Sequence, residues 1–248
     1  MKSLITLIYF HISLILCLFI FSVSLAETTD IATSSNKNDA TQLKVYQLEF
    51  SKLDSTSRKT WIQLLAKANE SALAPKPLEA INYIAQAEAI FASHPQLLTL
   101  KTLCYLQQKR LDLALLSAQK AYDLDSENYT STHNLAEIHF DLNQWDKAKT
   151  HYTKILESNN SLFLQFALDI IEIKLGNIDL IKPKLATLSP LSSEPYYFFL
   201  NYVITAEENP NNIEIQSALI EQIKSIYQYN PNLLIPWFDK LNASGYGL

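Results

Sequence analysis

Residues 134–156 read NLAEIHFDLNQWDKAKTHYTKIL and contain two histidines, a glutamate, two aspartates and a tryptophan. So many ionisable side chains in one stretch pose the question of a metal or catalytic site. His133 and Glu137 are four positions apart and share one face of a helix. His139 follows Glu137 by two positions and points elsewhere, and His151 falls in the next helix. Because these side chains do not converge, the pattern predicts helix packing and no metal ligands here.

The layout of this stretch also occurs 34 residues earlier in the chain. Residues 109–128 (KRLDLALLSAQKAYDLDSEN) and 143–160 (NQWDKAKTHYTKILESNN) each contain a polar turn, D-x-A, an amphipathic helix and a second polar turn. Ala80, Ala114 and Ala148 recur at the same spacing. One helix pair cannot bury its apolar face alone, so this period indicates stacked helix pairs. With no convincing strand pattern, we expect an all-α fold of about four to five pairs.

On these residues the chain resembles the tetratricopeptide repeat family. With Tyr129 as the first position of a repeat, the family's Leu, small and aromatic positions are filled by Leu135, Ala136, His139, Ala148 and Tyr152. Asn143 replaces the turn glycine, which asparagine can do because it adopts the left-handed conformation more readily than most residues. The best repeats are residues 95–128 and 129–162. The resemblance implies a solenoid of stacked helix pairs.

Several breaks interrupt the helical pattern. Pro75 and Pro77 should end one helix, and Pro183 should shorten or kink another. We expect His94 to lie exposed in a turn between repeats. A last helix pair is expected over residues 194–229, followed by a terminal capping segment that contains Trp237. The aromatic run PYYFFLNYV in that pair predicts a buried helix, and an exposed patch is the alternative.

The N-terminus has the pattern of an exported protein. Lys2 precedes a long apolar stretch that ends in Ser24-Leu25-Ala26, which predicts a signal peptide over residues 1–26. The stretch is also long enough for a retained membrane anchor. Polar residues 27–42 read as a flexible linker, and residues 43–248 as the repeat domain. We therefore expect a periplasmic or secreted protein, or one anchored in the inner membrane and facing the periplasm.

Composition excludes several classes of function. Three glycines in 248 residues argue against nucleotide-binding loops and nucleophile elbows. Cys104 is the one cysteine after the leader, so neither a disulfide nor a Cys zinc site forms there, and we expect a small buried side chain. After residue 26, 19 basic and 25 acidic residues give a charge of −6. This excess of acid, without a basic run, disfavours a nucleic-acid partner. We expect no catalytic residues, no cofactor and no metal.

The resemblance also implies where a partner would bind. In the family, the first helix of each pair lines a concave groove. The matching positions here are Thr99, Leu103 and Leu106 in one repeat, and Thr130, His133, Glu137, Phe140 and Asp141 in the next. Thr99 and Leu103 stand where the family's best-known groove has Lys and Asn, so its carboxylate chemistry is absent. A mixed apolar and acidic groove suits an amphipathic helix or a slightly basic peptide. The alternative is that these are ordinary solvated helix residues.

The resemblance to tetratricopeptide repeats implies a non-catalytic protein–protein interaction scaffold or assembly factor. The Ile-, Lys- and Asn-rich composition favours a bacterial source, and together with the leader it predicts a location in the cell envelope. Membrane contact is expected only if the N-terminal segment is retained. Two alternatives stay open: a helical envelope enzyme or carbohydrate-binding module on a solenoid scaffold, and a self-associating structural protein.

Overall fold

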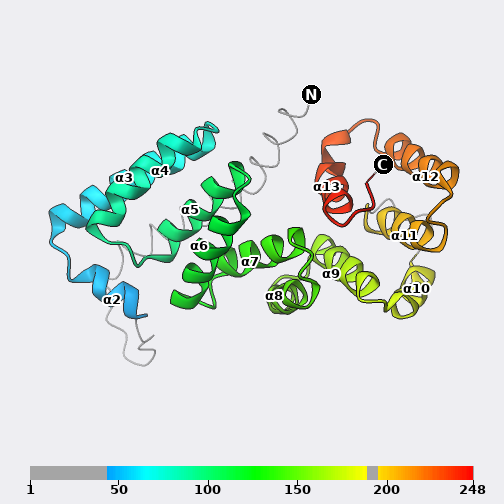
Figure 1. Ribbon diagram of the computed structural model, residues 1–248, viewed down its shortest axis with the longest axis horizontal. Helices are drawn as coiled ribbons and strands as arrows, with labels where there is room; N and C mark the ends of the chain where they lie inside the picture. The colour runs from blue at the N-terminus through cyan, green and yellow to red at the C-terminus, as the bar shows by residue number, and fades with distance from the viewer. Residues whose placement is uncertain (1–43, 189–194, 248) are drawn as a thin grey trace. The chain divides into compact units, whose positions relative to one another are not determined.

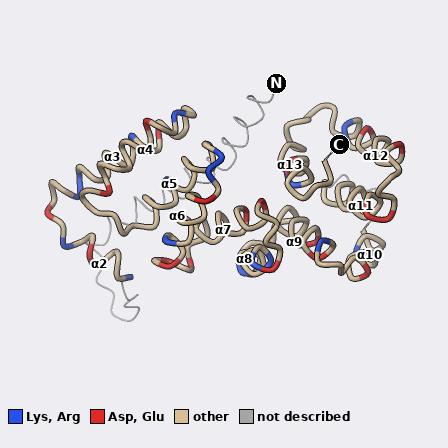
Figure 2. Tube along the Cα trace, in the orientation of Figure 1, with Lys and Arg blue, Asp and Glu red and all other residues tan. Residues whose placement is uncertain are grey.

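A computed structural model describes residues 44–188 and 195–247 (Figure 1). Within those residues the regular structure consists of twelve α-helices and one short 3-10 helix, without a strand. The all-α prediction is therefore confirmed. The chain divides after Ser131 into two compact units, which we call the N-terminal unit and the C-terminal unit. Both signs of charge are spread over most of the helices (Figure 2).

The N-terminal unit is built from two helix pairs and a short leading helix. Asp54 starts the first pair by accepting a hydrogen bond from the Ser57 N–H (2.9 Å). Pro75 lies in the turn of this pair, and Pro77 opens the next helix, as the sequence predicted. The helices are α2 (Val45–Ser51), α3 (Ser55–Leu73), α4 (Pro77–Ile90), α5 (Pro95–Gln107) and α6 (Leu111–Leu124).

The boundary between the units falls inside α7 (Tyr129–Asp141), most of which belongs to the C-terminal unit. Neighbouring helices again pack in chain order, α8 on α9, α9 on α10, and α11 on both α9 and α12. The remaining helices are α8 (Trp145–Ser158), α9 (Leu162–Lys174), α10 (Ile178–Thr187), α11 (Pro195–Glu208), α12 (Ile213–Ile226), the 3-10 helix η1 (Pro231–Leu234) and α13 (Ile235–Ala243). Pro183 lies inside α10, which is shorter than its neighbours.

The helix bounds repeat with the predicted period. The first and last residues of α7 each lie 34 positions after those of α5, and those of α8 lie 34 after those of α6. The same offset separates α6 from α4. From α7 to α9 the period falls to 33 residues, because α9 begins at Leu162. The 34-residue spacing of the sequence is thus a spacing of real helix pairs.

The turns of three successive pairs each use one residue in the left-handed conformation. Lys109 (φ 57°), Asn143 (φ 55°) and Gly176 (φ 86°) occupy equivalent places after α5, α7 and α9. The expectation that Asn143 substitutes for the turn glycine agrees with this geometry. Lys109 is the costly member of the series, since its Cβ disfavours a positive φ.

Lys109→Gly should therefore stabilise the chain by about 0.5–1 kcal/mol. Glycine relieves the strain of the positive φ, but part of this gain is lost because glycine also gives the unfolded chain more conformational entropy. Urea unfolding measures the change. The matched control is Gly176→Ala, which should destabilise by about 1 kcal/mol through backbone conformation alone. A Cβ at that glycine would meet nothing within 4 Å. Loss of stability in Lys109→Gly would contradict this account of the turn.

Buried alanines recur at one position in the second helix of three successive pairs. Ala80, Ala114 and Ala148 are all completely buried. Ala148→Leu should overpack the crossing of its helix and cost about 1–3 kcal/mol in free energy of unfolding. The same substitution at Ala218, which is exposed on α12, should change little. Equal urea midpoints for Ala148→Leu and the parent chain would contradict the assigned repeat.

His94 departs from its predicted exposure. Its ring packs among Tyr46, Phe50, Trp61 and Phe91, with centroid distances from 4.8 Å to Trp61 to 6.4 Å to Phe91. Burial lowers the pKa of His94 to about 4. The prediction of an exposed turn histidine was wrong, because α2 folds back and supplies two of these rings.

Two further predictions concern the leader and the single cysteine. The signal peptide and the linker lie outside the described residues. Among the helices of residues 44–188 and 195–247, none is both long and apolar enough to cross a membrane. Cys104 is completely buried, and burial raises the pKa of its thiol to about 12. The thiol is therefore an inert packing group, as predicted.

Candidate functional site

The C-terminal helix α13 lies against helices that come much earlier in the chain. Pro231 opens the 3-10 helix before it, and Pro236 occupies its first turn, where the missing N–H costs nothing. Trp237, Lys240 and Leu241 stand at i, i+3 and i+4, so they share one side of the helix. All three are buried. Thus α13 turns an aromatic, a cationic and an aliphatic side chain toward the rest of the C-terminal unit.

The aromatic part of this contact is a bed of phenylalanines. The Trp237 ring lies 5.0 Å from the Phe166 centroid and 5.5 Å from both Phe163 and Phe199. Phe238 makes an edge contact with Phe199 at 5.0 Å. These phenylalanines come from α9 and α11. The aromatic run of α11 was predicted to be buried, and Phe199 in that run is completely buried. Ring pairs of this kind contribute beyond the area that they bury.

The cationic part is Lys240, which is only 4% exposed. Its Nζ lies 2.6 Å from Glu137 Oε2 and 2.8 Å from the Tyr152 hydroxyl oxygen. The Tyr152 hydroxyl donates to Glu137 Oε1 at 2.5 Å. The ammonium also stands 4.1 Å from the centroid of the Phe140 ring, a cation–π contact. A buried charge is tolerated here because a carboxylate, a hydroxyl oxygen and an aromatic ring face are all in contact with it.

We call this surface the α13 face and define it by the residues that contact α13: Glu137, Phe140, Tyr152, Phe163, Phe166 and Phe199. It belongs entirely to the C-terminal unit. Its contacts are hydrophobic and aromatic at one end, and ionic at the other. It can therefore recognise a helix by shape and by charge.

Charge at the ionic end of the α13 face is fixed by its neighbours. Burial favours the neutral carboxyl of Glu137, but the charge of Lys240 and the hydrogen bonds from Lys240 and Tyr152 outweigh it and lower its pKa to about 2. Burial lowers the pKa of His133, which lies 3.8 Å from that carboxylate. Asp141 lies at the exposed edge of the α13 face. Desolvation and the charge of Glu137 raise its pKa to about 6. Glu137 is thus the fixed anion of the site.

The predicted groove residues of α7 do not all face solvent. Phe140 is completely buried and lies under Lys240, so its ring is not accessible to a partner while α13 is docked. Glu137 is already paired within the chain. Asp141 is exposed, and His133 is partly exposed. The expectation of an open surface at Phe140 is therefore corrected, because the chain's own C-terminal helix covers its ring. Glu137 stays partly exposed and is paired with Lys240.

The other predicted groove residues lie in the N-terminal unit. Thr99, Leu103, Leu106 and Thr130 are all partly exposed. Leu103 packs at the edge of a buried core that includes Cys104. Whether these residues contact a partner stays a prediction.

Two histidines that were predicted to lie apart, on successive helices, are in contact in the fold. His139 and His151 stack with a centroid distance of 5.6 Å and an interplanar angle of 6°. His139 is buried, as its packing position predicted, and its Nδ1 lies 2.8 Å from Gln144 Oε1. Burial, then the charges of His139 and Lys154, lower the pKa of His151 to about 4, and burial also lowers that of His139. The pair is therefore neutral at pH 7 and packs as two aromatic rings.

Acid should weaken this pair. An unfolded histidine binds a proton below its ordinary pKa of 6.5, whereas folded His151 binds one only near pH 4. The stability that neutral His151 contributes is therefore fully present above pH 6.5 and is lost as the pH falls toward 4. Between pH 7 and pH 5, the free energy of unfolding of His151→Phe should fall by about 1 kcal/mol less than that of the parent chain. Urea unfolding at the two pH values tests this, and identical losses would contradict it.

A carboxylate, a tyrosine and a lysine meet at three other places. Asp169 accepts from Lys184 Nζ (2.7 Å) and from the Tyr196 hydroxyl (2.6 Å). In the N-terminal unit, Lys44 and Tyr46 bind Asp125. At the chain end, the Tyr246 hydroxyl donates to Glu207, which lies 3.4 Å from Lys174 Nζ. Clusters of this type therefore fasten both α2 and the C-terminal segment.

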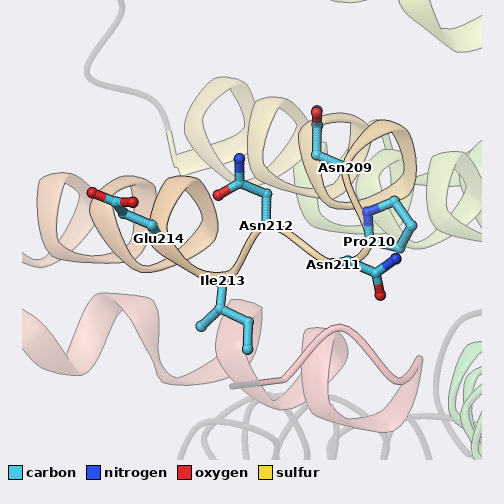
Figure 3. A pocket seen from close by; sticks show the side chains of 6 residues that line it. All are labelled: Asn209, Pro210, Asn211, Asn212, Ile213 and Glu214. Carbon is cyan, nitrogen blue, oxygen red and sulfur yellow. The ribbon is translucent and has the colours of Figure 1, made fainter.

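A hollow in the turn between α11 and α12 offers no comparable site. It is lined by residues 209–214, shown in Figure 3. Two of its polar groups are already used: the Asn212 side chain accepts from the Ile215 N–H at 3.1 Å, and the Asn209 carbonyl accepts from Gln216 at 2.9 Å. Across the described ranges, His, Cys, Asp and Glu side chains form no group of three suited to a metal ion. The α13 face is thus the candidate site.

Fold and site define an all-α protein of packed helix pairs with a helix held on one face. No family model matches the chain, and no curated protein matches it in sequence. A function for this chain is therefore inferred from its helix pairs and their contacts.

Proposed function

We propose that this chain is a non-catalytic scaffold that binds a helical segment of another protein. One observation carries the proposal: the α13 face already holds a helix, through the aromatic bed and the Lys240–Glu137 pair. A surface that holds one amphipathic helix in this way has the chemistry to hold another. The resemblance to tetratricopeptide repeats, with its 34-residue spacing, supports the same role.

We place this scaffold in a bacterial cell envelope, as an adaptor or assembly factor. The pattern of residues 1–26 supports export, followed by a periplasmic location or an anchor in the inner membrane. The excess of acidic residues suits a partner segment with positive charge. The predicted contacts on α5, Thr99, Leu103 and Leu106, would add a second surface in the N-terminal unit.

Site-specific crosslinking in envelope extracts tests the proposal. A photo-reactive residue at Asp141, on the exposed edge of the α13 face, should capture a defined protein. The same probe at Glu157, exposed on α8, should not. Glu137→Lys should abolish the capture at Asp141, whereas Lys224→Glu on exposed α12 should leave it unchanged, with helicity equal in all variants. The same products from Asp141 and Glu157, or capture insensitive to Glu137→Lys, would overturn the proposal.

A further inference from the structure

We propose that α13 is an internal copy of the partner: the α13 face binds helices that carry an aromatic residue, a lysine three positions later and a leucine after it, and α13 must leave before they bind. The inference rests on the proposed function and specifies its ligand. The pattern is that of Trp237, Lys240 and Leu241.

The aromatic position is set by the bed of rings. Trp237 is surrounded by Phe163, Phe166 and Phe199 at 5.0–5.5 Å. Leu241, one turn later, is 1% exposed. Positions i and i+4 share a helix face, so a ligand must be helical to present both. An extended peptide would point alternate side chains in opposite directions and fill only part of the bed.

The lysine position is set by the ionic end of the α13 face. A compact ammonium fits between Glu137 Oε2 and the Tyr152 oxygen, at 2.6 and 2.8 Å, with the Phe140 ring 4.1 Å away. Lysine is a point charge on a flexible stem, which suits contacts from several directions. An acidic residue at this position would face the fixed anion Glu137 and be rejected. The face therefore selects a helix by the sign of its charge as well as by its aromatic residue.

The docked α13 is built so that it can be released. It has only nine residues, and residues 228–233 before it are exposed. Releasing it returns Lys240 and Glu137 to water, and this hydration offsets part of the lost ion pair. A tethered helix is nevertheless present at high effective concentration, so an external helix competes poorly with it. We therefore expect binding to be weak in the parent chain and tighter when α13 is weakened.

The test is a fluorescence anisotropy titration with a labelled peptide of residues 231–247, PNLLIPWFDKLNASGYG. The full chain is used in its parent form and with Trp237→Ala and Lys240→Ala combined, which loosens α13 and leaves the α13 face intact. The loosened chain should bind the peptide at least about tenfold more tightly than the parent chain. A peptide with Lys240→Glu should not bind it. Adding Glu137→Lys to the loosened chain should reverse this preference, and adding Lys224→Glu on α12 should not.

Three outcomes overturn the inference. The first is a loosened chain that keeps its helicity and a cooperative melt yet does not bind the peptide. The second is binding that ignores the charge reversals. The third is a parent chain whose mass in solution doubles with concentration unless α13 is loosened, which would make a second copy the occupant. The proposed function fails separately: crosslinking that captures no partner would remove it even where the peptide binds, whereas a captured partner without peptide binding would remove only the inference.

Discussion

Phe199→Ala will lower the free energy of unfolding by about 3–5 kcal/mol, the largest effect that we expect from a single substitution. The ring is completely buried and contacts Phe166, Trp237 and Phe238 at centroid distances of 5.0–6.0 Å. Removing it takes away the side chain on which α11 and α13 meet and leaves a cavity. Since the surrounding rings are rigid, the cavity will collapse only partly.

Urea unfolding followed by circular dichroism measures this loss. Tyr229→Ala is the matched control, because that aromatic side chain is 94% exposed and its removal should change stability by less than about 0.5 kcal/mol. We also expect the Trp237 fluorescence of Phe199→Ala to shift toward that of a hydrated indole. Equal losses in the two variants would contradict the aromatic bed.

Lys240→Met will cost about 2–4 kcal/mol, although methionine is the more hydrophobic residue. The cost comes from Glu137, which would keep its negative charge on the α13 face without the ammonium 2.6 Å away. Glu137 is partly exposed (29%), so water recovers some of the loss and the effect stays below that of a fully buried pair.

The coupling between the two residues is measured with a double-mutant cycle. Glu137→Gln combined with Lys240→Met should recover most of the stability, since no charge then lacks a partner. Lys182→Met is the matched control: its exposed pair with Glu208, 2.8 Å long, should contribute no more than about 1 kcal/mol. Additive losses at Glu137 and Lys240 would mean that the ion pair does not hold α13.

The helix pairs could be predicted from the sequence because their signals are local. Ala114 and Ala148 recur at a fixed spacing, and Asn143 marks a turn that needs a left-handed residue. Such signals depend on residues within a few helical turns of each other. The shortening of α10 at Pro183 was predictable for the same reason.

The site could be predicted only in part. The resemblance of α7 to the first helix of a repeat predicted that Glu137 and Phe140 line a groove for a partner. It could not indicate that Lys240, 103 positions later, occupies that face. Nothing near Glu137 specifies its partner, and a lysine in a C-terminal helix reads as an ordinary solvated residue. His94 was misplaced for the same reason, because rings from a distant helix cover it.

Hydrogen–deuterium exchange of residues 231–247 in the full chain tests the central claim most directly. The exchange is compared with and without a saturating, unlabelled helix that carries the Trp-x-x-Lys-Leu pattern. We predict that the added helix raises exchange throughout α13 while α7 stays protected, because the new helix takes its place on the α13 face. Bound peptide with unchanged exchange in α13 would show that the two helices do not share a site, and would contradict the account.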